Sequence, residues 1–170
     1  MGKPDKNILK EVFAWFGAAT YAAQCFEFEL CTLLILFHML DNGYCKCTKK
    51  ELAKLDGDLS AMTMGKLLKK LRTRLKLFHE GRLEHIFKSP DDYLDIRNKL
   101  MHGFFTRHAE NFSTPEGCQV MIEELKVRYN KLFVAHDTAR EISRNIKQRL
   151  GFPEETLQEL VQTELSHLSD

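Results

Sequence analysis

The chain has 170 residues, of which 44% are hydrophobic and 29% charged, a composition that excludes a disordered or fibrous protein. Lysine and arginine total 25 and aspartate and glutamate total 24, so no global charge attracts nucleic acid or a membrane, and such a role would need a local patch. Five cysteines without framework spacing favour a reducing, cytoplasmic compartment over a disulfide scaffold. We expect one domain over residues 1–170, with its core in residues 7–150.

The first expected element is a long helix over residues 7–40. Its apolar residues recur at helical spacing, and most of the opposite side is apolar too. Such a helix must be covered on several sides, as the central helix of a bundle or as part of a dimer interface. Glu27 and Glu29 stand near its middle and would be costly at the centre of a bilayer, so we expect a buried helix rather than a membrane span.

Shorter helices follow. Thr48 and Glu51 form a capping-box pattern that opens one, which the sequence DGD at residues 56–58 is expected to break. Residues 63–78 predict an amphipathic helix.

The remaining helices are opened by prolines. The sequence SPDD at residues 89–92 predicts the start of a helix that runs to about residue 103. Ser113 or Thr114 is expected to cap a long helix over residues 115–150 that Gly151 ends, and Pro153 begins a short C-terminal helix over residues 153–170. Because no segment alternates persistently with period two, the prediction is an all-α helical bundle.

A short motif suggests a family. Residues 93–105 read YLDIRNKLMHGFF, in which Arg97, Asn98 and His102 match an Arg-polar pattern with His after four intervening residues. This resembles the signature of the HEPN superfamily. The segment TMGKLL at residues 63–68 and Phe104-Phe105 resemble a bacterial branch of it, and the similarity covers about residues 17–139.

The resemblance implies a HEPN-like helical bundle that is commonly a homodimer, with two motifs facing each other across the subunit interface. Many members are endoribonucleases that need no metal or cofactor, often toxins with a cognate antitoxin or phage-defence effectors. Others are inactive and bind a partner protein, a nucleotide or RNA.

In the catalytic reading, RNA is cleaved by its own 2′-hydroxyl. His102 would take the 2′-OH proton, Arg97 would stabilise the transition-state charge, and Asn98 would orient the phosphate or the imidazole. The leaving-group acid would be His102 of a second subunit. A kink after His102 would be needed to bring its side chain toward Arg97.

In the structural reading, Arg97 is a cation neutralised by Glu27 or Glu29 of the first helix, since an unpaired buried charge is expensive. Two features favour a non-catalytic module. Lys99 could pair with Asp95 one turn earlier, and the bulky pair Phe104-Phe105 could fill a cleft that a substrate would need.

Basic residues offer a further RNA-binding candidate, or else the solvated face of an amphipathic helix. The candidates are Lys66, Lys69, Lys70, Arg72, Arg74, Lys99, Arg107 and His108. His38, Cys45 and Cys47 lack the second ligand pair of a structural zinc site, and we expect no metal there.

Overall fold

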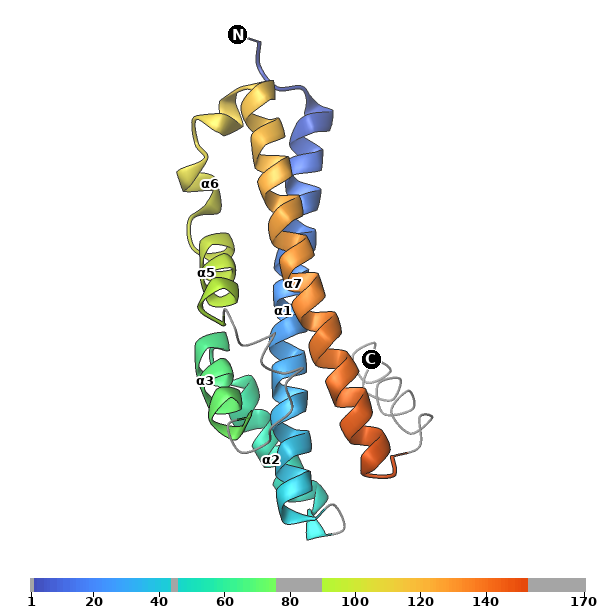
Figure 1. Ribbon diagram of the computed structural model, residues 1–170. Coiled ribbons are helices and arrows are strands. Elements are labelled where there is room, and N and C mark those ends of the chain that lie inside the picture. The colour runs from blue at the N-terminus through green and yellow to red at the C-terminus, as the bar shows by residue number, and fades with distance from the viewer. Residues whose placement is uncertain (1, 44–45, 76–89, 153–170) are drawn as a thin grey trace, which may run out of the picture.

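The computed structural model describes residues 2–43, 46–75 and 90–152, and every regular element in these ranges is a helix (Figure 1). The all-α bundle expected from the sequence is confirmed. The elements are α1 (Lys6–Asn42), α2 (Lys49–Ser60), α3 (Met64–Leu75), α5 (Pro90–Met101), α6 (Phe104–Arg107), the 3-10 helix η2 (Asn111–Ser113) and α7 (Pro115–Arg149).

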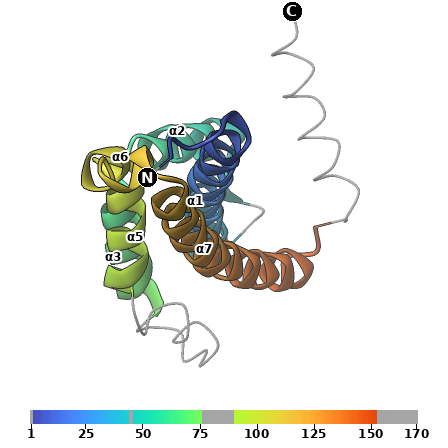
Figure 2. The same ribbon diagram turned by 90° about the horizontal axis from the view of Figure 1, so that it is seen from above.

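Two long helices form the frame of the molecule. Figures 1 and 2 show α1 and α7 running side by side in the same direction, with α3, α5 and α6 forming a returning column beside α1. The aromatic contacts follow this order, because Phe26 of α1 packs on Tyr93, and Phe16, nearer the start of α1, packs on Phe104. Trp15, also near the start of α1, meets Tyr129 of α7 edge to face.

Side chains cap the starts of α1, α2 and α7, and the caps of α2 and α7 were expected from the sequence. Asp5 accepts hydrogen bonds from the backbone of Asn7 and Ile8 at the start of α1. Thr48 and Glu51 form the complete capping box of α2. Of the two alternatives for α7, the cap is Thr114, whose hydroxyl accepts from the Gly117 N–H at 3.1 Å.

One predicted boundary is wrong. The segment at residues 56–58 does not break α2, which continues through Gly57 to Ser60. The reason is tertiary: Leu59 is buried in the core and Leu55 packs against it, which offsets the roughly 1 kcal/mol that a mid-helix glycine costs. The predicted extension of α3 to residue 78, the cap at Ser89 and the C-terminal helix at 153–170 lie outside the described residues.

The chain between α5 and α7 folds around an aromatic cluster. Gly103, with φ 91°, ends α5 in a left-handed conformation, and α6 and η2 follow. Phe104 is 1% exposed there, and Phe105 packs on Phe13, Phe16 and Phe104. Phe104 therefore lies in the bundle interior, and Phe105 is partly buried against it.

The apolar character of α1 follows from its central position. It is the one helix in the described part of the chain that is long and apolar enough to cross a membrane, and 56% of its apolar window is buried within the protein. Helices α2, α3, α5 and α7 all contact it. Its outer face nevertheless leaves Tyr21 and Phe28 68% and 69% exposed.

Candidate functional site

Arg97 lies in an ion pair between α5 and α1. Its Nε donates to Oε1 of Glu27 at 3.0 Å, and the two side chains keep only 22% and 27% of their surface exposed. Its Nη1 also donates to Oδ1 of Asn98, at a longer 3.4 Å. Of the two first-helix carboxylates considered from the sequence, Glu27 is the partner. The guanidinium is thus neutralised locally and ties the motif helix to the central helix.

Glu29 points to the other side of α1. It is 7% exposed, and its negative charge acts on Lys147 of α7. Burial lowers the pKa of Lys147, whereas the charge of Glu29 opposes that shift. The two glutamates therefore serve different seams of the bundle: Glu27 faces α5 and Glu29 faces α7.

His102 does not join Arg97 within one chain. The two residues are five positions apart on a regular helix, so their side chains leave it about 140° apart. The backbone N–H of His102 donates to Asn98 at 2.8 Å, which continues the helical pattern to this residue. The imidazole is exposed at the end of α5, while the Arg97 side chain is mostly buried against α1.

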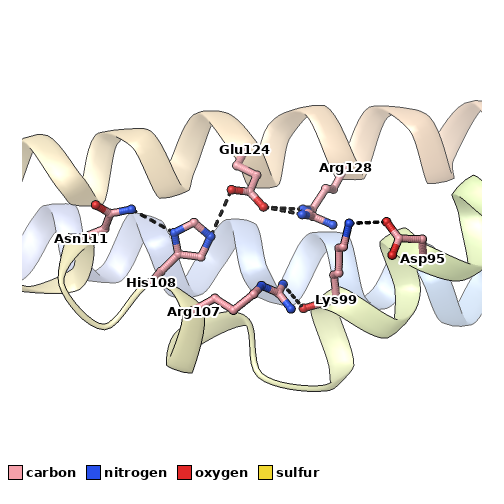
Figure 3. A network of polar contacts seen from close by, with 7 residues as sticks. All are labelled: Asp95, Lys99, Arg107, His108, Asn111, Glu124 and Arg128. Atoms are coloured by element: carbon pink, nitrogen blue, oxygen red, sulfur yellow. Dashed lines mark hydrogen bonds and ion pairs between the residues drawn. The ribbon is translucent and has the colours of Figure 1, made fainter.

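The exposed stripe of α5 carries its own ion pair. Lys99 Nζ lies 2.5 Å from Asp95 Oδ2, one turn away. The backbone oxygen of Lys99 accepts from Arg107 Nη2 at 2.6 Å, which satisfies a carbonyl at the end of α5 (Figure 3). Both cations thus have local structural roles.

His108 belongs to a network with α7. Its Nε2 lies 3.1 Å from Oε2 of Glu124, and its Nδ1 lies 3.1 Å from Nδ2 of Asn111. Arg128 donates to the other oxygen of Glu124, and Figure 3 shows the imidazole between Asn111 and this carboxylate. The His108 side chain is only 12% exposed. It fastens the end of α6 to α7 rather than adding to a basic surface.

The basic residues of α3 divide between two faces of that helix. Lys66, Lys69, Lys70 and Arg74 line a hollow of about 470 Å³ between α1, α2 and α3, whereas Arg72 is not among the lining residues. Arg74 forms an ion pair with Asp41. Lys99, Arg107 and His108 do not line this hollow.

The cysteines offer no ligand cluster within the described residues. No group of three or more His, Cys, Asp or Glu side chains is placed there to hold a metal ion, and Cys45 lies outside those residues. Cys31 and Cys118 are buried, as is usual for core cysteines. Burial, together with the charges of Asp56 and Glu27, raises the pKa of the Cys31 thiol to about 11.

Two features could not be recognised from the sequence. Glu124 and Arg128 have the i,i+4 spacing of an ion pair, but such pairs are common on exposed helix faces and do not by themselves indicate a network. The hollow beside α3 combines residues from three helices. The sequence indicated only that Lys66, Lys70 and Thr73 share one side of α3, because they are spaced by four and three residues.

Comparison with protein-family models, with curated proteins and with solved structures finds no match for this chain.

Proposed function

We propose that this protein is a HEPN-like dimeric module that binds a partner protein, a nucleotide or RNA and does not cleave RNA. The observation that carries this proposal is the hydrogen-bonded ion pair of Arg97 with Glu27. A cation that stabilises a phosphorane must have its charge available to the phosphate. Here a carboxylate already neutralises that charge, and the guanidinium leaves the helix on a different side from His102.

Other residues of the motif also support a structural role. Lys99 is engaged by Asp95, and Arg107 caps the backbone of α5. Phe104 is packed in the core directly after the motif. The pattern thus serves to hold α5 against α1 and to shape the end of α5.

The dimer is supported by the outer face of α1. Tyr21 and Phe28 are more than two-thirds exposed and lie seven residues apart, so they share one side of the helix. Large exposed apolar side chains on one helix face mark interaction sites, so this face of α1 supports the proposed dimer.

Charge on this face should separate the subunits. We expect the wild-type protein to have the mass of a dimer by size-exclusion chromatography with light scattering, and the double variant Tyr21→Glu, Phe28→Glu to have the mass of a monomer. Ala53→Glu is the control, because it adds a negative charge at an exposed position of α2, outside the proposed face. A wild-type monomer, or a dimer that survives the α1 double variant, would contradict the proposed interface.

A metal-independent ribonuclease is the second candidate, and the exposure of His102 favours it. The imidazole is open to solvent, so an RNA 2′-hydroxyl could reach it, as a general base requires. Arg97 keeps about a fifth of its side-chain surface exposed. In a symmetric dimer, His102 of one protomer could approach Arg97 of the other, so a composite site would not need the two groups to converge within one chain.

Total RNA separates the two functions. Purified protein is incubated with RNA in EDTA beside the variants Arg97→Ala and His102→Ala, with folding of each checked by circular dichroism. We expect the RNA to remain intact with all three proteins. Cleavage by the wild type that survives chelation and disappears in both folded variants would instead establish the ribonuclease.

A further inference from the structure

The hollow between α1, α2 and α3 has the size and lining of a small-ligand site. Its volume of about 470 Å³ falls within the roughly 300–1,000 Å³ typical of ligand pockets. Leu34 of α1, Leu59 of α2 and Met62, just after α2, contribute its apolar part. Leu34 and Leu59 also belong to the hydrophobic core, so this part of the wall is fixed by the packing of the bundle.

Positive charge frames this apolar surface. Lys66, Lys69 and Lys70 line the hollow from α3, and within the described ranges none of them forms an ion pair. Arg74 also lines it, but is partnered by Asp41. Three ammonium groups are therefore available to a negatively charged ligand whose apolar part lies on the leucines.

The helical spacing explains why these cations converge. Lys66, Lys70 and Thr73 recur at intervals of four and three residues, which places them on one side of α3. Arg72 stands two positions from Lys70 and leaves the helix in another direction, and it is absent from the lining. The same helix thus supplies both the site and an internal control.

The lining favours an aliphatic ligand over a nucleic acid. Single-stranded RNA is held by several aromatic side chains on which its bases stack, and the one ring among the ten residues lining this hollow is the imidazole of His38. Leucine and methionine instead suit an alkyl chain, while lysines suit a carboxylate or phosphate group.

We propose that this hollow binds a single-chain amphiphilic anion. Its carboxylate or phosphate head is held by Lys66, Lys69 and Lys70. Its alkyl chain lies against Leu34, Leu59 and Met62. The contribution of the chain can be separated from that of the head. Each methylene that is buried should strengthen binding by about four-fold, so a chain of several carbons should add far more than one order of magnitude.

In the test, decyl phosphate is titrated into the full chain below its micellar concentration, and binding is measured by isothermal titration calorimetry. We expect decyl phosphate to bind at least ten-fold more tightly than inorganic phosphate, and also more tightly than 1-decanol. The double variant Lys66→Gln, Lys70→Gln should lose most of this affinity. Arg72→Gln, which removes a charge from the same helix outside the hollow, should keep it.

Four results would overturn the proposal. The first is equal binding of decyl phosphate and inorganic phosphate, which would mean that the apolar wall is not used. The second is an equal loss in Arg72→Gln and in the double variant, which would indicate a diffuse charge effect. The third is an RNA oligonucleotide that binds through Lys66 and Lys70 and is not displaced by decyl phosphate. Anionic vesicles that bind while monomeric decyl phosphate does not would likewise replace the hollow with a membrane surface.

Discussion

Replacing Phe104 with alanine should lower the free energy of unfolding by about 3–5 kcal/mol. The ring is 1% exposed and packs on Phe16 and Phe105 at centroid distances of 5.7 and 5.4 Å. It also lies 4.6 Å from the ring of His108, so its removal leaves a cavity beside the network that fastens α6 to α7. Urea denaturation followed by circular dichroism measures the loss.

Lys54→Ala is the control for that experiment. Lys54 is exposed on α2, outside the proposed dimer face, and its truncation should change the free energy of unfolding by less than about 0.5 kcal/mol. If Phe104→Ala is as mild as the control, Phe104 does not occupy the core, and the view that the residues after the motif fill the bundle interior is wrong.

The second large effect is expected at Gly117, in the first turn of α7. A Cβ placed there would lie 2.2 Å from the backbone oxygen of Asn111 and 2.5 Å from its Cα. Because the obstructing atoms are backbone, no side chain can rotate away, and α7 must shift from η2. We expect Gly117→Ala to lower the free energy of unfolding by about 3 kcal/mol, at the upper end of overpacking effects.

For Gly57, which is also a glycine within a helix, substitution by alanine should change the free energy of unfolding in the opposite direction. Nothing lies within 4 Å of its added Cβ. Alanine is favoured over glycine there by backbone entropy and propensity, so Gly57→Ala should raise the free energy of unfolding by up to about 1 kcal/mol. Two alanine substitutions that both stabilise the protein would mean that η2 does not pack closely on α7.

Much of the fold could be predicted because its signals are local. Thr48 and Thr114 cap their helices through side-chain chemistry that can be recognised in the sequence. The end of α2 could not be predicted in the same way. Gly57 is a helix breaker by propensity, and only the burial of Leu59 in a core built from distant helices overrides it.

The sequence allowed the ion pairs of the candidate site to be predicted, but not how the helices bring the residues together. Local spacing placed Asp95 beside Lys99, and the need to neutralise Arg97 pointed to Glu27 or Glu29. Choosing between those two glutamates required the relative rotation of α1 and α5, which sequence spacing does not encode. For the same reason His108 was expected to extend a basic surface, whereas the packing of α6 on α7 directs it to Glu124.

The role of Arg97 can be measured most directly by a double-mutant cycle with Glu27→Gln and Arg97→Met, using the free energy of unfolding of each protein. A structural ion pair that is about three-quarters buried should show a coupling energy of about 1–2 kcal/mol, between the values of exposed and fully buried pairs. The same cycle between Arg97 and His102→Ala should give a coupling near zero. A negligible coupling with Glu27, together with RNA cleavage that requires Arg97, would contradict the structural role and support a catalytic role for the guanidinium.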